Sequence, residues 1–268
     1  MSAVQGERVD NPVRYERKGA ALWIVIDREA RRNALNEQVA AGIAAGLDQA
    51  EADRSVRAVV LTGAGDKAFC AGGDLQLRAD GTPFTIDEAD PRHFVARLLR
   101  RMDACRLPIV ARVNGHALAG GLGLVCACDV VVARDDALLG VTEVKVGIFP
   151  MMILPYLLRC IPYRTMMEMC LTGEPAPASQ FLADRLINYA VPAAELDAKT
   201  DWLVERITTK SPTGIRLGKQ ALAKIREMST DSALEYAQFM LANMARTKDA
   251  LEGFRAFNEK RAPDWTGE

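Results

Sequence analysis

The chain has no long apolar run, almost no excess of charge of either sign and only two histidines. No stretch of its 268 residues approaches the roughly 20 apolar residues that a membrane-spanning helix needs. The 34 Lys and Arg residues are balanced by 35 Asp and Glu residues, which gives a formal charge of −1 and no general basic field for nucleic acid. We therefore expect neither a membrane nor a nucleic acid as partner.

Cysteine and histidine are too sparse and too poorly spaced to form a metal site. The six cysteines include no Cys-x-x-Cys pair, and only His93 and His116 could complete a ligand set. Reduced, buried thiols are expected, with no metal and no separate cofactor. Residues 1–11 are polar and lack the apolar segment of a signal peptide. A cytoplasmic location is therefore expected.

Short apolar runs alternate with amphipathic segments along most of the chain. The pattern predicts strands over 15–17, 22–26, 56–62, 108–113 and 130–133, and helices over 35–53, 93–106 and from the glycines near 120 to 127. The strands show no period of two, which is typical of an α/β sheet covered by helices. After residue 202 only helices are predicted, over 202–209, 213–228, 231–245 and 248–260. We expect a core over 1–201 and a helical C-terminal subdomain over 202–268 that takes part in oligomerisation.

Two glycine-bearing segments are the most informative feature of the chain. The sequences AFCAGGD at 68–74 and NGHALAGGLG at 114–123 place small residues where a strand gives way to a helix. Backbone N–H groups at such a junction point at a ligand from the positive end of the helix. Two donors aimed at one oxygen would form an oxyanion hole. The segments indicate an enzyme that acts on a carbonyl, and the alternative is that the glycines only allow close packing.

These segments belong to an ordered set that resembles the crotonase, or enoyl-CoA hydratase/isomerase, superfamily. The set covers nearly the whole chain and comprises residues 32–36, 67–74, 108–123, 128–129, 143–150 and 256–261. The resemblance implies a spiral core of repeated ββα units followed by a helical region, assembled as homotrimers or homohexamers. It also implies an acyl-CoA thioester as the substrate, so that coenzyme A enters as part of the substrate.

The resemblance also implies which residues meet the substrate. The peptide N–H groups of Ala71 and Gly120 would bind the thioester oxygen and stabilise an enolate-like transition state. The implied substrate- and CoA-binding residues are Arg28, Arg32, Lys67, Ala68, Phe69, Gly73, Asp74, Gly121, Phe257 and Lys260.

One acid–base residue stands where the hydratases of this superfamily have two glutamates. The first of the two positions is Gly123 here, and the second is Glu143. Glu143 lies in an apolar stretch, where burial would raise the pKa of its carboxyl group toward neutrality. The alternative is a surface carboxylate paired with Lys145.

The single carboxylate leaves several reactions open. We favour hydration of a 2-enoyl-CoA, since the segments around 121–125 and 142–144 also resemble bacterial hydratases of branched substrates of the methylglutaconyl-CoA kind. The next candidate is a Δ3,Δ2-enoyl-CoA isomerase, because one glutamate suffices to move a proton between two carbons. Thioester hydrolysis or decarboxylation would give Cys70 or His116 the larger role. The last alternative is a non-catalytic acyl-CoA binder.

Overall fold

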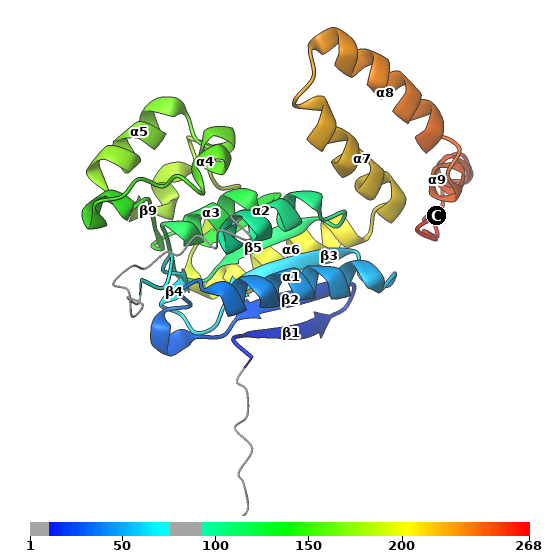
Figure 1. Cartoon of the computed structure of the whole chain (residues 1–268). Coiled ribbons are helices and arrows are strands. Elements are labelled where there is room, and N and C mark those ends of the chain that lie inside the picture. Colours follow the sequence, from blue (N-terminus) through cyan, green and yellow to red (C-terminus); the bar gives the residue numbers. More distant parts are fainter. Residues whose placement is uncertain (1–10, 76–92) are drawn as a thin grey trace, which may run out of the picture.

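The computed structural model describes residues 11–75 and 93–268, which form two sheets surrounded by helices (Figure 1). The larger sheet has six strands in the order β1-β2-β3-β5-β7-β10, and only the β1–β2 pair is antiparallel. Its strands are β1 (Val13–Lys18), β2 (Ala21–Ile26), β3 (Ala58–Gly63), β5 (Ile109–Val113), β7 (Val130–Arg134) and β10 (Tyr189–Val191). The smaller sheet has the order β4-β6-β8-β9, with strands β4 (Ala68–Cys70), β6 (His116–Leu118), β8 (Leu138–Gly140) and β9 (Ala176–Pro177).

Helices follow the strands and then take over the C-terminal quarter of the chain. The α-helices are α1 (Glu37–Ala52), α2 (Phe94–Ala104), α3 (Gly120–Ala127), α4 (Leu154–Cys160), α5 (Tyr163–Thr172), α6 (Leu196–Thr208), α7 (Pro212–Ile225), α8 (Thr230–Met244) and α9 (Lys248–Glu259). Short 3-10 helices are η1 (Glu29–Arg31), η2 (Glu143–Val146), η3 (Ala178–Phe181) and η4 (Ala193–Glu195). None of the helices in the described residues is long and apolar enough to cross a membrane.

The chain repeats a ββα unit that alternates between the two sheets. In the units β3-β4-α2 and β5-β6-α3, the first strand joins the larger sheet and the second joins the smaller one. Strands of successive units pair in parallel, β3 with β5 and β4 with β6. Each unit therefore adds one strand to each layer, which is a spiral. The predicted α/β class and spiral architecture are confirmed.

Both faces of the larger sheet are buried, as the absence of a two-residue period predicted. Leu22, Ile24 and Ile26 of β2 face the main core with α1 and α2, whereas Trp23 packs on the opposite face with Leu203 of α6. Fully buried strands have no need of polar residues at alternate positions. The core thus extends above and below the larger sheet.

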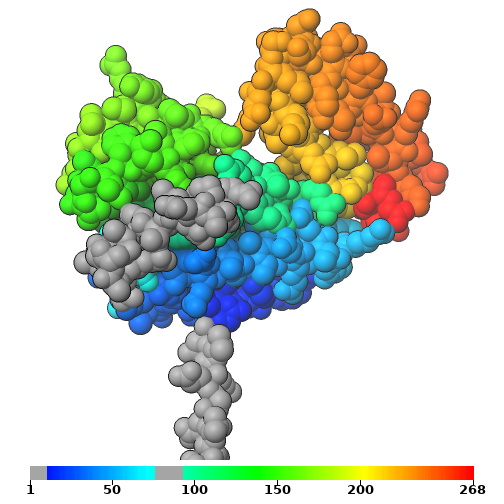
Figure 2. Space-filling model, in the orientation of Figure 1, coloured from blue at the N-terminus to red at the C-terminus, as the bar shows by residue number. Residues whose placement is uncertain are grey.

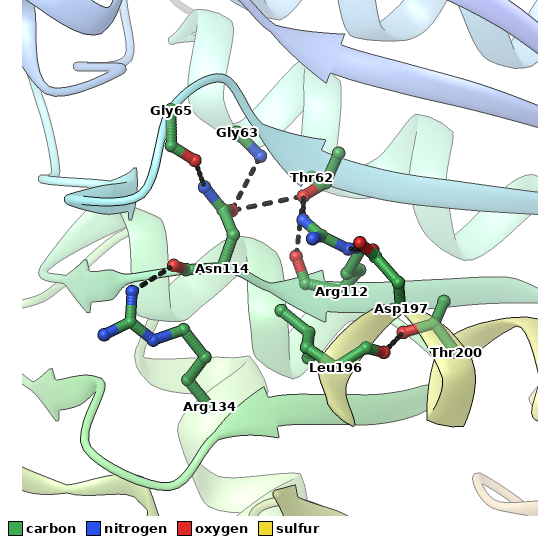
Figure 3. Close-up of polar contacts among 9 residues, drawn as sticks. All are labelled: Thr62, Gly63, Gly65, Arg112, Asn114, Arg134, Leu196, Asp197 and Thr200. Atoms are coloured by element: carbon green, nitrogen blue, oxygen red, sulfur yellow. Dashed lines mark hydrogen bonds and ion pairs between the residues drawn. The ribbon is translucent and has the colours of Figure 1, made fainter. Parts of the chain in front are cut away.

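Two buried asparagines hold the turns that follow the strands. Asn114, just after β5, accepts hydrogen bonds from the Gly63 amide at 3.1 Å and donates to the Gly65 carbonyl at 2.8 Å (Figure 3). Asn33 donates to the carbonyls of Ala64 and Ala68 at 3.0 and 2.7 Å. Buried turn backbone needs partners of this kind, because an unpaired polar group away from water costs free energy. These amides fix the region that leads into β4.

The boundary predicted between residues 201 and 202 falls inside α6. This helix begins at Leu196 and belongs to the core, since Leu196 and Leu203 are buried against the larger sheet and Asp197 pairs with Arg112 of β5 at 2.7 Å (Figure 3). The helical extension is α7 to α9. Figure 2 shows α7 to α9 as one lobe and α4 with α5 as another, with a hollow between them.

The long elements lie close to their predicted positions, and the short ones were not predicted. The predicted strand over 22–26 is β2, and the predicted helix over 248–260 is α9. The strands of the smaller sheet contain only two or three residues each. Such segments carry no periodic signal, because a period needs several repeats to be visible.

Candidate active site

A cavity of about 630 Å³ opens where the ββα spiral meets the segment that follows β8. The turn after β4, the N-terminus of α3, one face of α2 and residues 142–153 line it. Its outer wall is apolar, formed by Val146, Ile148, Phe149, Met151 and Met152. The cavity therefore suits a long, largely apolar ligand with a polar group at the end where β4 and α3 meet.

The main chain of Leu35 forms hydrogen bonds with the turn after β4, one on each side of Gly73. The Leu35 amide donates to the Gly72 carbonyl at 2.7 Å, and the Asp74 amide donates to the Leu35 carbonyl at 2.9 Å. In a parallel bridge of this kind, Gly73, which lies between Gly72 and Asp74, directs its own N–H away from Leu35. Gly73 lines the cavity, and its N–H has no acceptor among the described residues. This amide is therefore free to bind a ligand.

The amide of Ala71 is not available in the same way. It donates to the carbonyl of Arg32 at 3.1 Å, so it faces the loop before α1. The expectation that Ala71 supplies one oxyanion donor is therefore corrected: Gly73, expected only to contact substrate, has the free N–H. Gly72, between them, has a φ of 101°, which breaks the regular alternation of an extended strand, so the N–H groups of Ala71 and Gly73 point in different directions.

Gly120 presents the second free amide at the first turn of α3. The preceding residue, Ala119, has a φ of 50°, a conformation unusual for alanine that turns the chain sharply into the helix. The first amides of a helix have no intrahelical acceptor. A Cβ atom added to Gly120 would lie 3.8 Å from the Gly73 nitrogen, so the two amides are neighbours. Together they can bind one oxygen at the positive end of the helix.

Glu143 is the carboxylate of the cavity. It opens η2 after β8, and its Oε2 atom is buried with no hydrogen-bond partner among the described residues. Burial raises the pKa of the Glu143 carboxyl group, although the main-chain amides of Glu143 and Thr142 act in the opposite direction. Lys145 pairs with Glu174 at 2.8 Å rather than with Glu143. The alternative of a surface pair between Glu143 and Lys145 is therefore wrong.

Gly123 has no room for a second carboxylate. A Cβ atom at this position would overlap the side chain of Ile153, which precedes α4 and itself lines the cavity. Ile153 thus fills the space beside α3, and Glu143 is the only carboxylate among the described residues that line the cavity. Ile153 carried no signal in the sequence, because its contact with Gly123 depends on the packing of α4 against α3.

The structure separates the other predicted binding residues into four groups. Gly73 lines the cavity. Arg28 and Asp74 pair with each other at 2.9 Å, so the Arg28 guanidinium braces the turn after β4. Ala68, Phe69 and Gly121 are buried and are not among the residues that line the cavity. Arg32 and Lys67 are exposed beside these turns, and Phe257 and Lys260 lie in and after α9, outside the cavity of this chain.

The two residues considered for other chemistry are engaged in the structure. Burial raises the pKa of the Cys70 thiol to about 11, which disfavours the thiolate that a nucleophile needs. His116 accepts a hydrogen bond from the Leu138 amide at 3.0 Å and links β6 to β8. No group of three or more His, Cys, Asp or Glu residues in the described part of the chain could hold a metal ion.

Comparison with known proteins identifies the family. The family model described as Enoyl-CoA hydratase/isomerase matches residues 16–268. A relative from Thermus thermophilus is 37% identical over 92% of this chain and 97% of its own length. The (E)-benzylidenesuccinyl-CoA hydratase of Thauera aromatica is 31% identical over 96% of this chain and 99% of its own. The crystal structure of an enoyl-CoA hydratase from Mycobacterium tuberculosis H37Rv superimposes with a TM-score of 0.86 at 33% identity, covering 97% and 100% of the two chains. This chain belongs to the enoyl-CoA hydratase/isomerase family.

The contact between Gly123 and Ile153 generates a stability prediction. Gly123→Ala should lower the free energy of unfolding by about 1–3 kcal/mol, because the added methyl group overpacks a filled core. Ile153→Ala should cost more alone, but the double variant should be more stable than the sum of the two losses predicts. Urea unfolding of all four proteins measures this coupling. Strictly additive losses would show that the two side chains do not compete for the same space.

Proposed function

We propose that this protein hydrates a 2-enoyl-CoA thioester. The observation that carries the proposal is the buried, unpartnered Oε2 of Glu143 in a cavity whose other end presents the free amides of Gly73 and Gly120. The family membership supports an acyl-CoA substrate, and the hydratase names among the relatives support the reaction.

The geometry suggests how one carboxylate performs both proton transfers. The thioester oxygen of the substrate accepts hydrogen bonds from the Gly73 and Gly120 amides, which stabilise negative charge as it develops there. The Glu143 carboxylate takes a proton from water, and the hydroxide oxygen bonds to C3 while the double-bond electrons move to the thioester oxygen. The protonated Glu143 then returns the proton to C2, so one water is added in total.

A specific observation also favours isomerisation of a 3-enoyl-CoA as the second candidate. Ile153 occupies the space beside Gly123, so no second carboxylate holds a water molecule in the described cavity. Isomerisation needs no water: Glu143 would remove a proton from C2 and return it to C4, while the same amides hold the enolate. The two reactions use one site and differ only in whether water reaches C3.

Hydration and isomerisation are distinguished by the absorbance of the conjugated enoyl thioester. The wild-type protein should remove this absorbance from 2-enoyl-CoA substrates and form the 3-hydroxyacyl product, with a mass gain of one water. Glu143→Gln should lower kcat at least about a hundredfold, because it removes the acid–base group and preserves the shape of the site. Glu174→Gln, which alters a carboxylate that pairs with Lys145 outside the cavity, is the matched control and should keep normal turnover.

The outcomes separate the candidates. A rise in absorbance from 3-enoyl-CoA substrates without a change in mass would make the enzyme an isomerase. Full activity of the Glu143→Gln variant would remove Glu143 from either mechanism. Thermal melting serves as the control for folding. Because burial disfavours the charged form of Glu143, the Glu143→Gln variant should have a Tm no lower than that of wild type at pH 7.

The raised pKa of Glu143 predicts a pH dependence. Glu143 must be ionised to act as a base, so kcat/KM should fall as the pH is lowered through the pKa of this group in the free enzyme. Because burial raises that pKa, the fall should occur at a higher pH than the value of about 4.3 for an exposed glutamate. A pH profile of kcat/KM checks this. A profile that stays flat down to pH 4 would contradict a buried base.

We further propose that the chain assembles into a homotrimer or homohexamer through its helical extension. No residue of α8 is buried, and Phe239 and Leu241 are each 70% exposed. Sedimentation velocity should show a trimer or hexamer for wild type, and Phe239→Glu with Leu241→Glu should shift it toward monomer. Asn243→Glu, on the same helix, controls for added charge. A monomeric wild-type protein would contradict the proposed assembly. A double variant that stays oligomeric would contradict the proposed role of α8 in the interface.

A further inference from the structure

Arg100 is a cation in the cavity that the proposed reaction does not use. It lies on α2 and lines the cavity together with His93 and Ala96, three and four residues apart along one helix face. No hydrogen bond or ion pair joins Arg100 to the residues that the structure describes. Arg100 is also exposed to solvent, so its guanidinium offers a planar pair of donors at the edge of a largely apolar cavity.

The other charged side chains of α2 all have partners. Arg97 pairs with Glu37 at 3.3 Å, and Arg101 pairs with Asp48 at 2.8 Å and with Glu51. Asp103, one turn after Arg100, accepts a hydrogen bond from the Tyr156 hydroxyl at 2.9 Å and pairs with Arg159. The carboxylates named here are thus occupied by other groups, and Arg100 has no hydrogen-bond or ion-pair partner among the residues that the structure describes.

The remaining ionisable groups of the cavity do not neutralise Arg100. Burial is the main cause that lowers the pKa of His93, and its Nδ1 accepts a hydrogen bond from the Val95 amide, so His93 favours the neutral form. Burial raises the pKa of Glu143, and hydrogen bonds from main-chain amides oppose this rise. In the proposed reaction Glu143 serves proton transfer, and Arg100 is left to bind another part of the ligand.

We propose that Arg100 binds a carboxylate at the far end of the acyl group, so that the preferred substrate is the mono-CoA thioester of an unsaturated dicarboxylic acid. This inference rests on the proposed acyl-CoA function and adds the substrate class. A carboxylate matches the guanidinium with two parallel hydrogen bonds, whereas a plain alkyl chain offers it no acceptor. The apolar residues that line the same cavity then accommodate the carbon chain.

The test is a binding measurement with saturated acyl-CoA probes that cannot react. Succinyl-, glutaryl- and adipoyl-CoA are compared with butanoyl-, pentanoyl- and hexanoyl-CoA, which have the same chain lengths without the carboxylate, and with free coenzyme A. Wild type should bind at least one dicarboxylic probe about tenfold or more tightly than its neutral match. Arg100→Met should abolish that preference and leave the affinity for the neutral probes within about twofold. Arg97→Met, which removes the same charge from the same helix outside the cavity, should keep it.

Three other results of the binding measurement would contradict the proposed role of Arg100, each for a different reason. An equal loss of affinity for dicarboxylic probes, neutral probes and free coenzyme A in Arg100→Met would show that Arg100 binds a CoA phosphate. Equal affinity of wild type for the members of every pair would show that no carboxylate is recognised. Failure of every probe to bind wild type would overturn the acyl-CoA function together with this inference.

Turnover separates the substrate class from the reaction. With hex-2-enedioyl-CoA and 2-hexenoyl-CoA, Arg100→Met should raise KM for the dicarboxylic substrate about tenfold and change kcat little, because the proposed role of Arg100 is to bind the carboxylate and not to act on the reacting carbons. A preserved binding preference without hydration of either substrate would overturn the proposed reaction and retain the role of Arg100. Loss of kcat with both substrates would show instead that the variant damages the site itself.

Discussion

The structure of the site depends on the close approach of α3 to the turn after β4. A side chain at Gly121 would overlap the carbonyl oxygen of Cys70, so only glycine permits this distance. The approach places the N–H of Gly120 beside that of Gly73, which Leu35 has already turned toward the cavity. Two donors from segments almost fifty residues apart in the chain thus meet because two main chains touch. No flexible side chain takes part, so the geometry is set before a ligand arrives.

The segment after β8 completes the site by adding charge and apolar surface together. Glu143 enters the cavity at the start of η2, and Gly147 ends that turn with a φ of 80°. The chain then passes through the apolar residues of the cavity wall to Ile153, which fills the space beside Gly123. The burial that raises the pKa of Glu143 and the packing that leaves it without a second carboxylate therefore come from one stretch of chain.

The larger sheet, apart from the three-residue strand β10, and the long helices that cover it could be predicted from the sequence because they carry long periodic or apolar segments. The smaller sheet could not, because β4, β6 and β8 have three residues each and owe their position to the pairing of successive ββα units. In the active site, too, the sequence could not show which groups the folded chain brings into contact. Glycine-rich turns indicated free amides, but only the hydrogen bonds of Leu35 and Arg32 show that Gly73, and not Ala71, has the free one.

The positions of the charges in the cavity are consistent with a division of labour along the acyl chain. A cation close to Glu143 would stabilise its ionised form and lower its pKa, which would weaken it as a base. Burial raises the pKa of Glu143, and Arg100 is not among the causes of that shift, whereas the charge of Arg100 opposes the rise in the pKa of Tyr156 of α4. Arg100 and Glu143 line the same cavity from α2 and from η2, respectively. A substrate with charge at its far end could then be bound by one group without changing the proton affinity of the other.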